Sequence, residues 1–200
     1  MRALRVNRSI AQADQDNQLA CSAQAGCLAS FELLVFRYQT RMLNFLIHHT
    51  DSLERAEDVL QETWLRAYQS LNTYNSNWQF STWIFTIARR LAQRNIPPKH
   101  LRLENDDPLA NESHQSDVVD ELDWRNHLWQ EIRRYTSDDE FEALWLHYVE
   151  QIPIAEISQT LGKSHAATKM MLSRTRKRLS RCIASFVNSH HNEPPLCRRA

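Results

Sequence analysis

A ladder of cationic side chains follows the second of the two glycines in this 200-residue chain. Six lysines and arginines fall within thirteen residues of a run that is compatible with a helix over 165–181. They are Lys169, Arg174, Arg176, Lys177, Arg178 and Arg181. Clustered positive charge is the property with which proteins bind the phosphates of nucleic acid. The segment therefore indicates DNA binding.

The residues before and within this ladder predict a helix-turn-helix. Residues 154–161 are compatible with a short helix, Gly162 supplies a tight turn, and Ser164 stands where it can cap the second helix. The start of such a helix reaches base edges in the major groove, while flanking cations bind phosphates. The residues predicted to contact duplex DNA are Ser164, His165, Lys169, Met170, Ser173, Arg174, Arg176 and Lys177. The alternative is a solvated cationic helix that packs on its neighbours.

A second group of polar, aromatic and basic residues spans a loop and the helix predicted over 80–95. The loop at 72–77 is rich in turn-forming residues, and three arginines follow on the helix. The group consists of Tyr74, Asn75, Asn77, Trp78, Arg89, Arg90 and Arg94. Aromatic stacking combined with positive charge is how proteins hold single-stranded nucleic acid. Phe80, Trp83 and Phe85 have an alternative place in the core, and for Trp83 we favour the core.

The helix before this loop carries a predicted acidic patch. Apolar residues, Leu65 and Tyr68 among them, recur along one face of 51–71 and are predicted to be buried. Asp58, Gln61 and Glu62 then face outward. Such a patch suits a basic partner surface, although exposed acids on most helices are simply solvated.

The elements that must position these residues are all predicted to be helices. The chain has only two glycines, no Asn-Gly or Asp-Gly turn and little alternation of apolar with polar residues. These features argue against strands. Amphipathic helices are predicted at 28–49, 51–71 and 80–95, and two prolines at 97–98 end the third. A cap is predicted at Asp51, a helix over about 118–135, and a capping box at 137–140. The predicted fold class is all-α.

Composition divides the chain into two small helical domains joined by an acidic flexible linker. The predicted segments are a flexible arm or frayed helix (1–27), a first domain (28–96), the linker (97–117), a second domain that contains the helix-turn-helix (118–185) and a disordered tail (186–200). The net charge of zero hides a segregation of charge. Residues 99–140 hold twelve acidic and five basic residues, whereas 141–200 hold four acidic and nine basic ones. Only the basic end suits phosphate.

Several functional classes have no support in the residues. No long apolar run predicts membrane insertion, and the N-terminal arginines are not followed by the apolar core of a secretory signal, so we expect a cytoplasmic protein. The four cysteines form no Cys-x-x-Cys pair, and we expect neither a metal nor a cofactor. Nucleophile–base pairs and phosphate-cradling glycine loops are also missing, so we do not expect an enzyme.

Three segments, in this order along the chain, resemble the extracytoplasmic-function (ECF) sigma factors of bacterial RNA polymerase. They are AEDVLQETWLRAY at 56–68, FSTWIFTIARRLA at 80–92 and the run 148–179. The resemblance covers 28–96 and 132–183. It implies that the chain recruits core polymerase to specific promoters and starts transcription without catalysis of its own. An anti-sigma factor that masks the polymerase-facing surfaces is also implied.

The resemblance further implies roles for the residue groups. The helix with Asp58, Gln61 and Glu62 would dock on the clamp helices of the largest polymerase subunit. The loop at 74–79 and the helix after it would hold a base flipped from the opened −10 element. The helix-turn-helix would read the −35 element as duplex, and the acidic linker would thread the RNA-exit path of the polymerase.

Departures from the family pattern leave the target sequence open. Residues 168–171 read TKMM, where the family has an apolar residue, Lys, Ser and Arg, and Arg90 and Arg94 replace an Asn and an Asp. The DNA-facing edge of the first domain is therefore more basic than in the family. The alternative function is a helix-turn-helix regulator of another class, with an N-terminal dimerisation domain.

Overall fold

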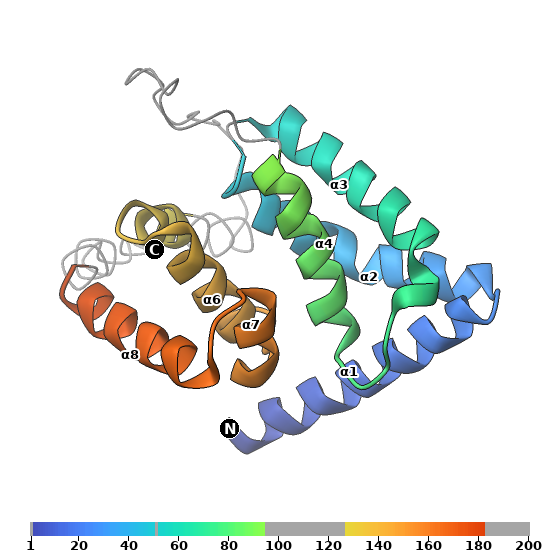
Figure 1. The fold of residues 1–200 in the computed structure, drawn as a ribbon, viewed down its shortest axis with the longest axis horizontal. Coiled ribbons are helices and arrows are strands. Elements are labelled where there is room, and N and C mark those ends of the chain that lie inside the picture. Colours follow the sequence, from blue (N-terminus) through green and yellow to red (C-terminus); the bar gives the residue numbers. More distant parts are fainter. Residues whose placement is uncertain (1, 51, 95–126, 183–200) are drawn as a thin grey trace, which may run out of the picture.

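The structure is a computed structural model that describes residues 2–50, 52–94 and 127–182, with side chains described from residue 12 onward. All regular elements in these ranges are helical, which confirms the all-α prediction. They form an N-terminal unit (2–94) and a C-terminal unit (127–182), which contact each other (Figure 1). Among the described helices, none is both long and apolar enough to cross a membrane.

Four α-helices and a short 3-10 turn build the N-terminal unit. Their bounds are α1 Arg2–Gln24, α2 Leu28–Ile47, α3 Leu53–Gln69, η1 Leu71–Thr73 and α4 Phe80–Arg94. One face of α2 lies in the core because its apolar residues recur at helical spacing. The buried residues of this face are Phe31, Leu34, Tyr38, Met42, Phe45 and Leu46. Phe80 and Phe85 of α4 are also buried, so both belong to the core.

The segment for which composition leaves a flexible arm or a frayed helix open contains helix α1, from Arg2 to Gln24. Ala20 and Ala23 of α1 are buried. The Asp16 carboxylate is 2% exposed and accepts a hydrogen bond from the Tyr38 hydroxyl at 2.7 Å. Apolar periodicity does not reveal α1, because its buried face consists of alanines and a polar anchor rather than large apolar side chains.

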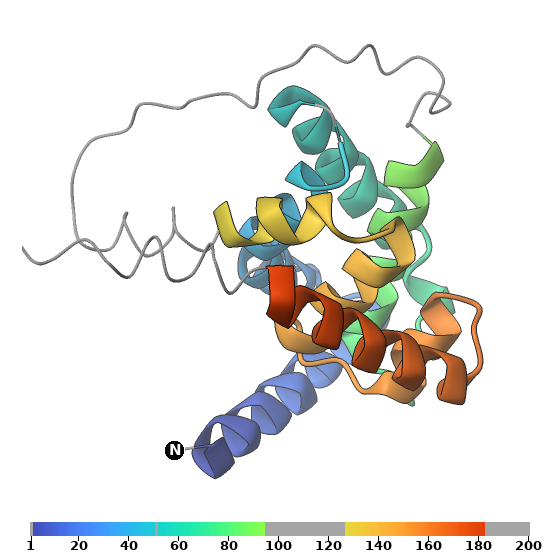
Figure 2. The ribbon, with the colours of Figure 1, turned by 90° about the vertical axis from the view of Figure 1, so that its left-hand side faces the viewer.

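The C-terminal unit begins with a helical stretch at 127–134 and continues with three helices. They are α6 (Asp138–Tyr148), α7 (Ile154–Thr160) and α8 (His165–Cys182), and α8 is the long helix nearest the viewer in Figure 2. The predicted capping box is confirmed, since Ser137 and Glu140 each accept a hydrogen bond from the other's backbone N–H. Gly162, with φ +63°, turns the chain from α7 into α8 in a conformation that glycine adopts at little cost.

Other expectations lie outside the described residues or differ in detail. The linker (97–117), the expected helix start near 118 and the tail (186–200) are outside the described ranges. The cap of α3 is Ser52, whose Oγ accepts a hydrogen bond from Arg55 N at 3.2 Å, and not Asp51. Ser and Asp are almost equally good caps, so the sequence does not separate two neighbouring candidates.

Candidate nucleic-acid interfaces

The DNA-reading face predicted on α8 is open to solvent. The helix is capped as predicted, because Ser164 Oγ accepts a hydrogen bond from Ala167 N at 3.2 Å. Its buried residues are Thr168, Leu172, Thr175 and Leu179. The exposed residues include all eight that are predicted to contact duplex DNA, namely Ser164, His165, Lys169, Met170, Ser173, Arg174, Arg176 and Lys177. A single buried stripe leaves the opposite side of the helix free for a ligand.

Not every cation of the ladder belongs to this face. Arg178 donates hydrogen bonds to the Glu140 carboxylate at 2.7 Å and to the Tyr135 carbonyl at 3.0 Å. Lys163, in the turn before α8, lies 2.9 Å from the Asp139 carboxylate. These two cations therefore hold the C-terminal unit together.

Helix α1 holds the start of the loop between η1 and α4. The Gln24 side-chain amide nitrogen lies 3.1 Å from the carbonyl oxygens of Leu71 and Tyr74 and 3.2 Å from that of Asn72. One donor group thus gathers three carbonyls, of which that of Leu71 also accepts a hydrogen bond from Tyr74 N at 3.1 Å. The chain enters the loop in a defined direction.

Helix α1 also holds the end of this loop. Asn17 Oδ1 accepts a hydrogen bond from Phe80 N, the first residue of α4, at 2.8 Å. The Tyr74 hydroxyl lies 3.0 Å from Asn17 Oδ1 and 3.0 Å from the Trp78 carbonyl. With Gln24 at one end and Asn17 at the other, residues 75–79 project from a braced base.

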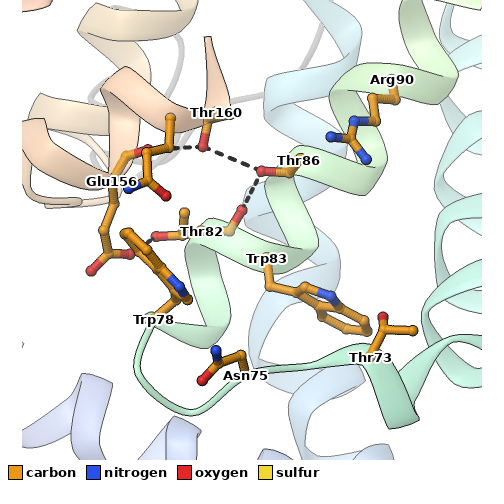
Figure 3. Close-up of a pocket in the computed structure, with 10 residues that line it drawn as sticks. Thr73, Asn75, Trp78, Thr82, Trp83, Thr86, Arg90, Glu156 and Thr160 are labelled. Atoms are coloured by element: carbon orange, nitrogen blue, oxygen red, sulfur yellow. Dashed lines mark hydrogen bonds between the residues drawn. The ribbon is translucent and has the colours of Figure 1, made fainter. Parts of the chain in front are cut away.

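A cavity of about 280 Å³ opens beside the braced loop, between α4 and α7 (Figure 3). Trp83, Thr86 and Arg90 line it from one face of α4, at steps of three and four residues. The other lining residues are Thr73, Asn75, Trp78, Thr82, Glu156, Gln159 and Thr160. Indole rings, an arginine and several hydroxyls supply the stacking surface and the donors that hold an unpaired base.

The structure brings together part of the predicted single-strand group. Asn75, Trp78 and Arg90 line the cavity, and Asn77 is exposed in the same loop. Arg94 is exposed one turn beyond Arg90 on α4. These five residues lie on or near one surface.

Two predicted members of that group face other parts of the molecule. Tyr74 is 5% exposed, and its ring packs edge-on against those of Phe80 and Trp83, with centroids 5.9 and 5.6 Å away. Arg89 is 14% exposed and donates a hydrogen bond to the Glu142 carboxylate on α6. Neither side chain is open to DNA in this arrangement. Trp83, for which the core is favoured, is only partly buried and serves both core and cavity.

The sequence-based group misses several residues of the cavity. Thr82 and Thr86 are two of these, and they precede Arg90 of the group at steps of four on α4, a signal that helical spacing makes available. Glu156 gives no such signal, because it lies 74 residues from Thr82, whose hydroxyl donates a hydrogen bond to its carboxylate. Only the tertiary structure places Glu156 beside Trp78 (Figure 3).

Three carboxylates of the C-terminal unit are buried against the N-terminal unit. Glu142 accepts from Arg89, Glu150 accepts from Arg41, and Glu156 lies at the cavity. Burial raises the pKa of Glu142 to about 7, although Arg89 opposes the shift. Burial likewise raises the pKa of Glu150, with Arg41 opposing. The contact therefore removes charged groups from water and pairs them across the two units.

A pair of histidines lies in the same contact. The His48 ring packs against Phe141 and Trp145, with centroids 5.6 and 5.5 Å away, and His49 lies 5.3 Å from Phe141. Burial, reinforced by the nearby Arg133 cation, lowers the pKa of His48 to about 4 and that of His49 to about 3. Both imidazoles are therefore neutral at pH 7.

The acidic patch predicted on α3 is exposed at Asp58 and Gln61, while Glu62 is partly exposed and lies 3.6 Å from Arg66. The prediction that Leu65 and Tyr68 are buried is wrong, since they are 57% and 55% exposed. The buried stripe of α3 consists of small residues, Ala56, Val59, Thr63 and Ala67. Because these small residues face the core, Leu65 and Tyr68 face solvent beside the acidic patch. The exposed surface of α3 is therefore both acidic and apolar.

Comparisons with known proteins agree with this arrangement of two units. The family described as Sigma-70 region 2 matches residues 34–97, and the family described as Sigma-70, region 4 matches residues 137–179. The chain is 28% identical over 143 residues to the RNA polymerase sigma-H factor of Pseudomonas aeruginosa, which covers 70% of each protein. It is also 28% identical over 154 residues to the ECF RNA polymerase sigma factor SigM of Bacillus subtilis, covering 76% of this chain and 93% of SigM.

Two solved structures share the fold. CnrH, in complex with the cytosolic domain of CnrY, matches with a TM-score of 0.61 and 19% identity over 86% of this chain and 98% of CnrH. The sigma factor RpoE of Bartonella quintana, in complex with the anti-sigma factor NepR, matches with a TM-score of 0.55 and 18% identity over 77% of this chain and 96% of RpoE.

The brace on the loop yields a test with a matched pair of variants. Gln24→Glu replaces the donor with a carboxylate that faces three carbonyl oxygens. We therefore expect amide hydrogen exchange in residues 71–80 to accelerate about tenfold, because each lost hydrogen bond costs about 1 kcal/mol. Asn17→Asp adds the same charge on the same helix but keeps the acceptor oxygen, so protection should persist. Equal exchange rates in the two variants, measured by mass spectrometry, would contradict the brace.

The lowered pKa values of His48 and His49 predict that stability depends on pH. A histidine whose pKa is lowered by folding contributes stability above pH 6.5 and loses it as the pH falls toward 4. The raised pKa of Glu142 has the opposite effect on the pH dependence of stability. We therefore compare the stability of His48→Phe with that of wild type at each pH, because both proteins contain Glu142. Between pH 7.5 and pH 5 the variant should gain about 1–2 kcal/mol in relative stability, measured by urea unfolding. A constant difference would show that folding does not lower the pKa of His48.

Proposed function

The chain belongs to the extracytoplasmic-function sigma factors, which recognise promoters for RNA polymerase, and from this premise we propose how its units divide that work. We assign core polymerase and the −10 element to residues 28–96, the −35 element to 118–185, and the connection between them to 97–117. In this proposal the chain acts in the cytoplasm, where polymerase and promoters are. It performs no catalysis, because recognition needs only binding energy.

The observation that carries the −10 assignment is the cavity beside the braced loop. Extraction of a base from the stack costs a few kcal/mol. Stacking on an aromatic side chain returns about 1–3 kcal/mol per base, and Trp78 supplies such a ring in the lining of the cavity. Arg90 and Arg94 follow on one face of α4, where they suit the phosphates of the extruded strand, and Asn75 and Asn77 carry amides that can pair with base edges.

The −35 assignment rests on the exposed face of α8. The capped start of the helix presents Ser164 and His165, and Lys169, Met170, Ser173 and Arg174 follow on the solvent side. We propose that the first residues reach base edges and that Arg174, Arg176 and Lys177 bind phosphates. The loss of the family arginine at Met171 leaves the preferred bases to experiment.

The polymerase assignment rests on α3. Asp58, Gln61 and Glu62 offer negative charge and hydrogen bonds, and the neighbouring Leu65 and Tyr68 add apolar area to the same exposed surface. Interfaces that combine an apolar centre with a charged rim bind more tightly than charge alone allows. We propose this surface as the contact with the polymerase clamp.

We further propose that an anti-sigma factor holds this chain inactive. CnrH and RpoE, which share the fold, were each solved in complex with a protein partner, the cytosolic domain of CnrY and the anti-sigma factor NepR. The exposed apolar residues of α3 would be masked by such a partner.

Transcription in vitro tests the function directly. Full-length chain with core polymerase from its own host should initiate at a defined subset of sites on a genomic library, whereas core polymerase alone should not. A helix-turn-helix regulator of another class would bind DNA without binding core polymerase. The absence of any promoter-specific initiation would refute the proposal.

Substitutions on α8 test the −35 assignment on a promoter mapped in this way. Loss of a phosphate contact in Arg174→Ala should weaken binding to all promoters and reduce the slope of log K against log salt by about 1. Loss of a base contact in Lys169→Ala should change sequence preference at one position. Arg178→Ala removes the same charge from the same helix, but Arg178 pairs with Glu140, so it should leave the salt slope unchanged. Equal slopes for Arg174→Ala and Arg178→Ala would contradict the assignment.

A further inference from the structure

Helix α2 carries a second apolar stripe, on the side of the helix that faces away from the core. Phe36 is 72% exposed, more than any other large apolar side chain that the structure describes. Leu33 and Ile47 of the same helix are 40% and 38% exposed. Single exposed apolar residues are common on soluble proteins, but a row of them along one helix face marks an interaction site.

The stripe has the spacing of a coiled-coil seam. Positions that alternate in steps of four and three residues remain on one side of two helices that wind around each other, and they are the a and d positions of a heptad repeat. The six positions of this series on α2 are Ala29, Leu33, Phe36, Thr40, Leu43 and Ile47. Five of them are exposed, and Leu43 is partly buried. Not one of the six is charged, so the outer face of α2 is suited to pack against another helix.

The residue types at these positions fit a parallel pair of identical helices. In parallel two-stranded coiled coils, β-branched residues are favoured at a and leucine at d. Thr40 and Ile47 are β-branched residues at a, and Leu43 stands at d, one heptad after the aromatic ring of Phe36. A polar residue at a single a position specifies the register of such a pair. Thr40 supplies that residue near the middle of the stripe, where its hydroxyl meets the same hydroxyl of a second copy.

The charges beside the stripe also match a parallel second copy. Glu32 and Arg37 occupy g and e positions that flank the stripe, five residues apart. In a parallel pair a g residue faces the e residue five positions later in the other helix, so Glu32 of each copy meets Arg37 of the other. Glu32 is exposed, and Arg37 is held beside the stripe by Asp16 at 2.5 Å while its side chain stays 26% exposed. An antiparallel pair would bring Glu32 toward residues 44–47, which include no cation.

We propose that the outer face of α2 is a homodimerisation surface, on which a second copy of this chain docks through its own α2 as a parallel coiled coil. The contact is isologous, because the same stripe serves both copies. The residues assigned to DNA and polymerase all lie on other elements, so this surface is separate from those of the proposed function. The stripe covers fewer than the about 3–4 heptads of a long-lived coiled coil, and the dimer therefore dissociates on dilution.

Sedimentation equilibrium of the full chain tests this contact with two matched variants. Phe36→Glu places a charge in the stripe, whereas Leu65→Glu makes the same kind of change at a position of α3 that is 57% exposed. We expect wild type and Leu65→Glu to dimerise with similar Kd values. Phe36→Glu should raise the Kd at least about 100-fold, because each dimer loses its aromatic anchor twice.

Two results of this experiment would overturn the proposal. Wild type that stays monomeric at every concentration would leave the stripe to a helix of another protein. Equal loss of the dimer in Phe36→Glu and Leu65→Glu would show that the contact is not made by α2. A circular dichroism melt checks that each variant is folded, and Phe36→Ala replaces Phe36→Glu if that variant is not.

Cross-linking tests the parallel orientation. Ala29 is exposed near the N-terminal end of the stripe. In a parallel pair the two copies of this residue meet, whereas in an antiparallel pair they lie at opposite ends. In a background with the four native cysteines replaced by serine, Ala29→Cys should form a covalent dimer when diamide is added, and Leu65→Cys should not. Failure of Ala29→Cys to cross-link, or equal cross-linking of both variants, would contradict the parallel pair.

Charge reversal beside the stripe tests the match between the two copies. Glu32→Lys sets a cation against Arg37 of the other copy, so we expect the Kd of the dimer to rise about tenfold at low salt and less at high salt. Glu57→Lys makes the same change at an exposed position of α3 and should leave the Kd unchanged. If the two variants share one Kd, the pairing of Glu32 with Arg37 is refuted, and the parallel second copy with it.

Discussion

A carboxylate that leaves water must find a donor, and this requirement at Glu142, Glu150 and Glu156 decides how the two units sit together. Each group is buried in the contact and paired with a side chain or backbone donor of the N-terminal unit. The orientation of α6 and α7 follows from these pairs. The lining of the cavity by α7, the withdrawal of Arg89 from solvent, the burial of His49 and the partial burial of His48 all depend on that orientation.

The same pairs limit the strength of the contact. Desolvation of an ion pair offsets most of its Coulomb attraction, and the raised pKa of Glu142 is a direct sign of that cost. Apolar packing between Phe45 and Trp145, whose ring centroids are 6.0 Å apart, also stabilises the contact between the units. A contact of this kind holds a specific geometry without large net stability.

Within the N-terminal unit, hydrogen bonds rather than ion pairs hold the loop between η1 and α4. The loop that we assign to the −10 element is held by Gln24 and Asn17 of α1, two polar side chains that bind backbone groups. Backbone groups outside helices need such partners. Residues 75–78 therefore stand on a backbone that is held at both ends.

Much of the fold was predictable because its determinants are local. The capping box at Ser137, the left-handed turn at Gly162 and the cap of α8 at Ser164 each depend on residues within four positions. The apolar stripe of α2 likewise follows from helical spacing. For α1 the sequence left a flexible arm and a frayed helix open, because alanines and a polar anchor bury its face. Leu65 and Tyr68 were misplaced because small residues form the buried stripe of α3.

By itself the sequence determined the helical class, the capped and basic reading helix, and the family to which the chain belongs, since these reside in residue types and short spacings. Only the tertiary structure decided which predicted residues are exposed. It withdrew Tyr74 into the core, turned Arg89 toward Glu142, and brought Glu156 to the cavity. The physical reason is distance along the chain: Arg41 and Glu150 meet across 109 positions, and no local pattern encodes a charge that is buried by so remote a partner.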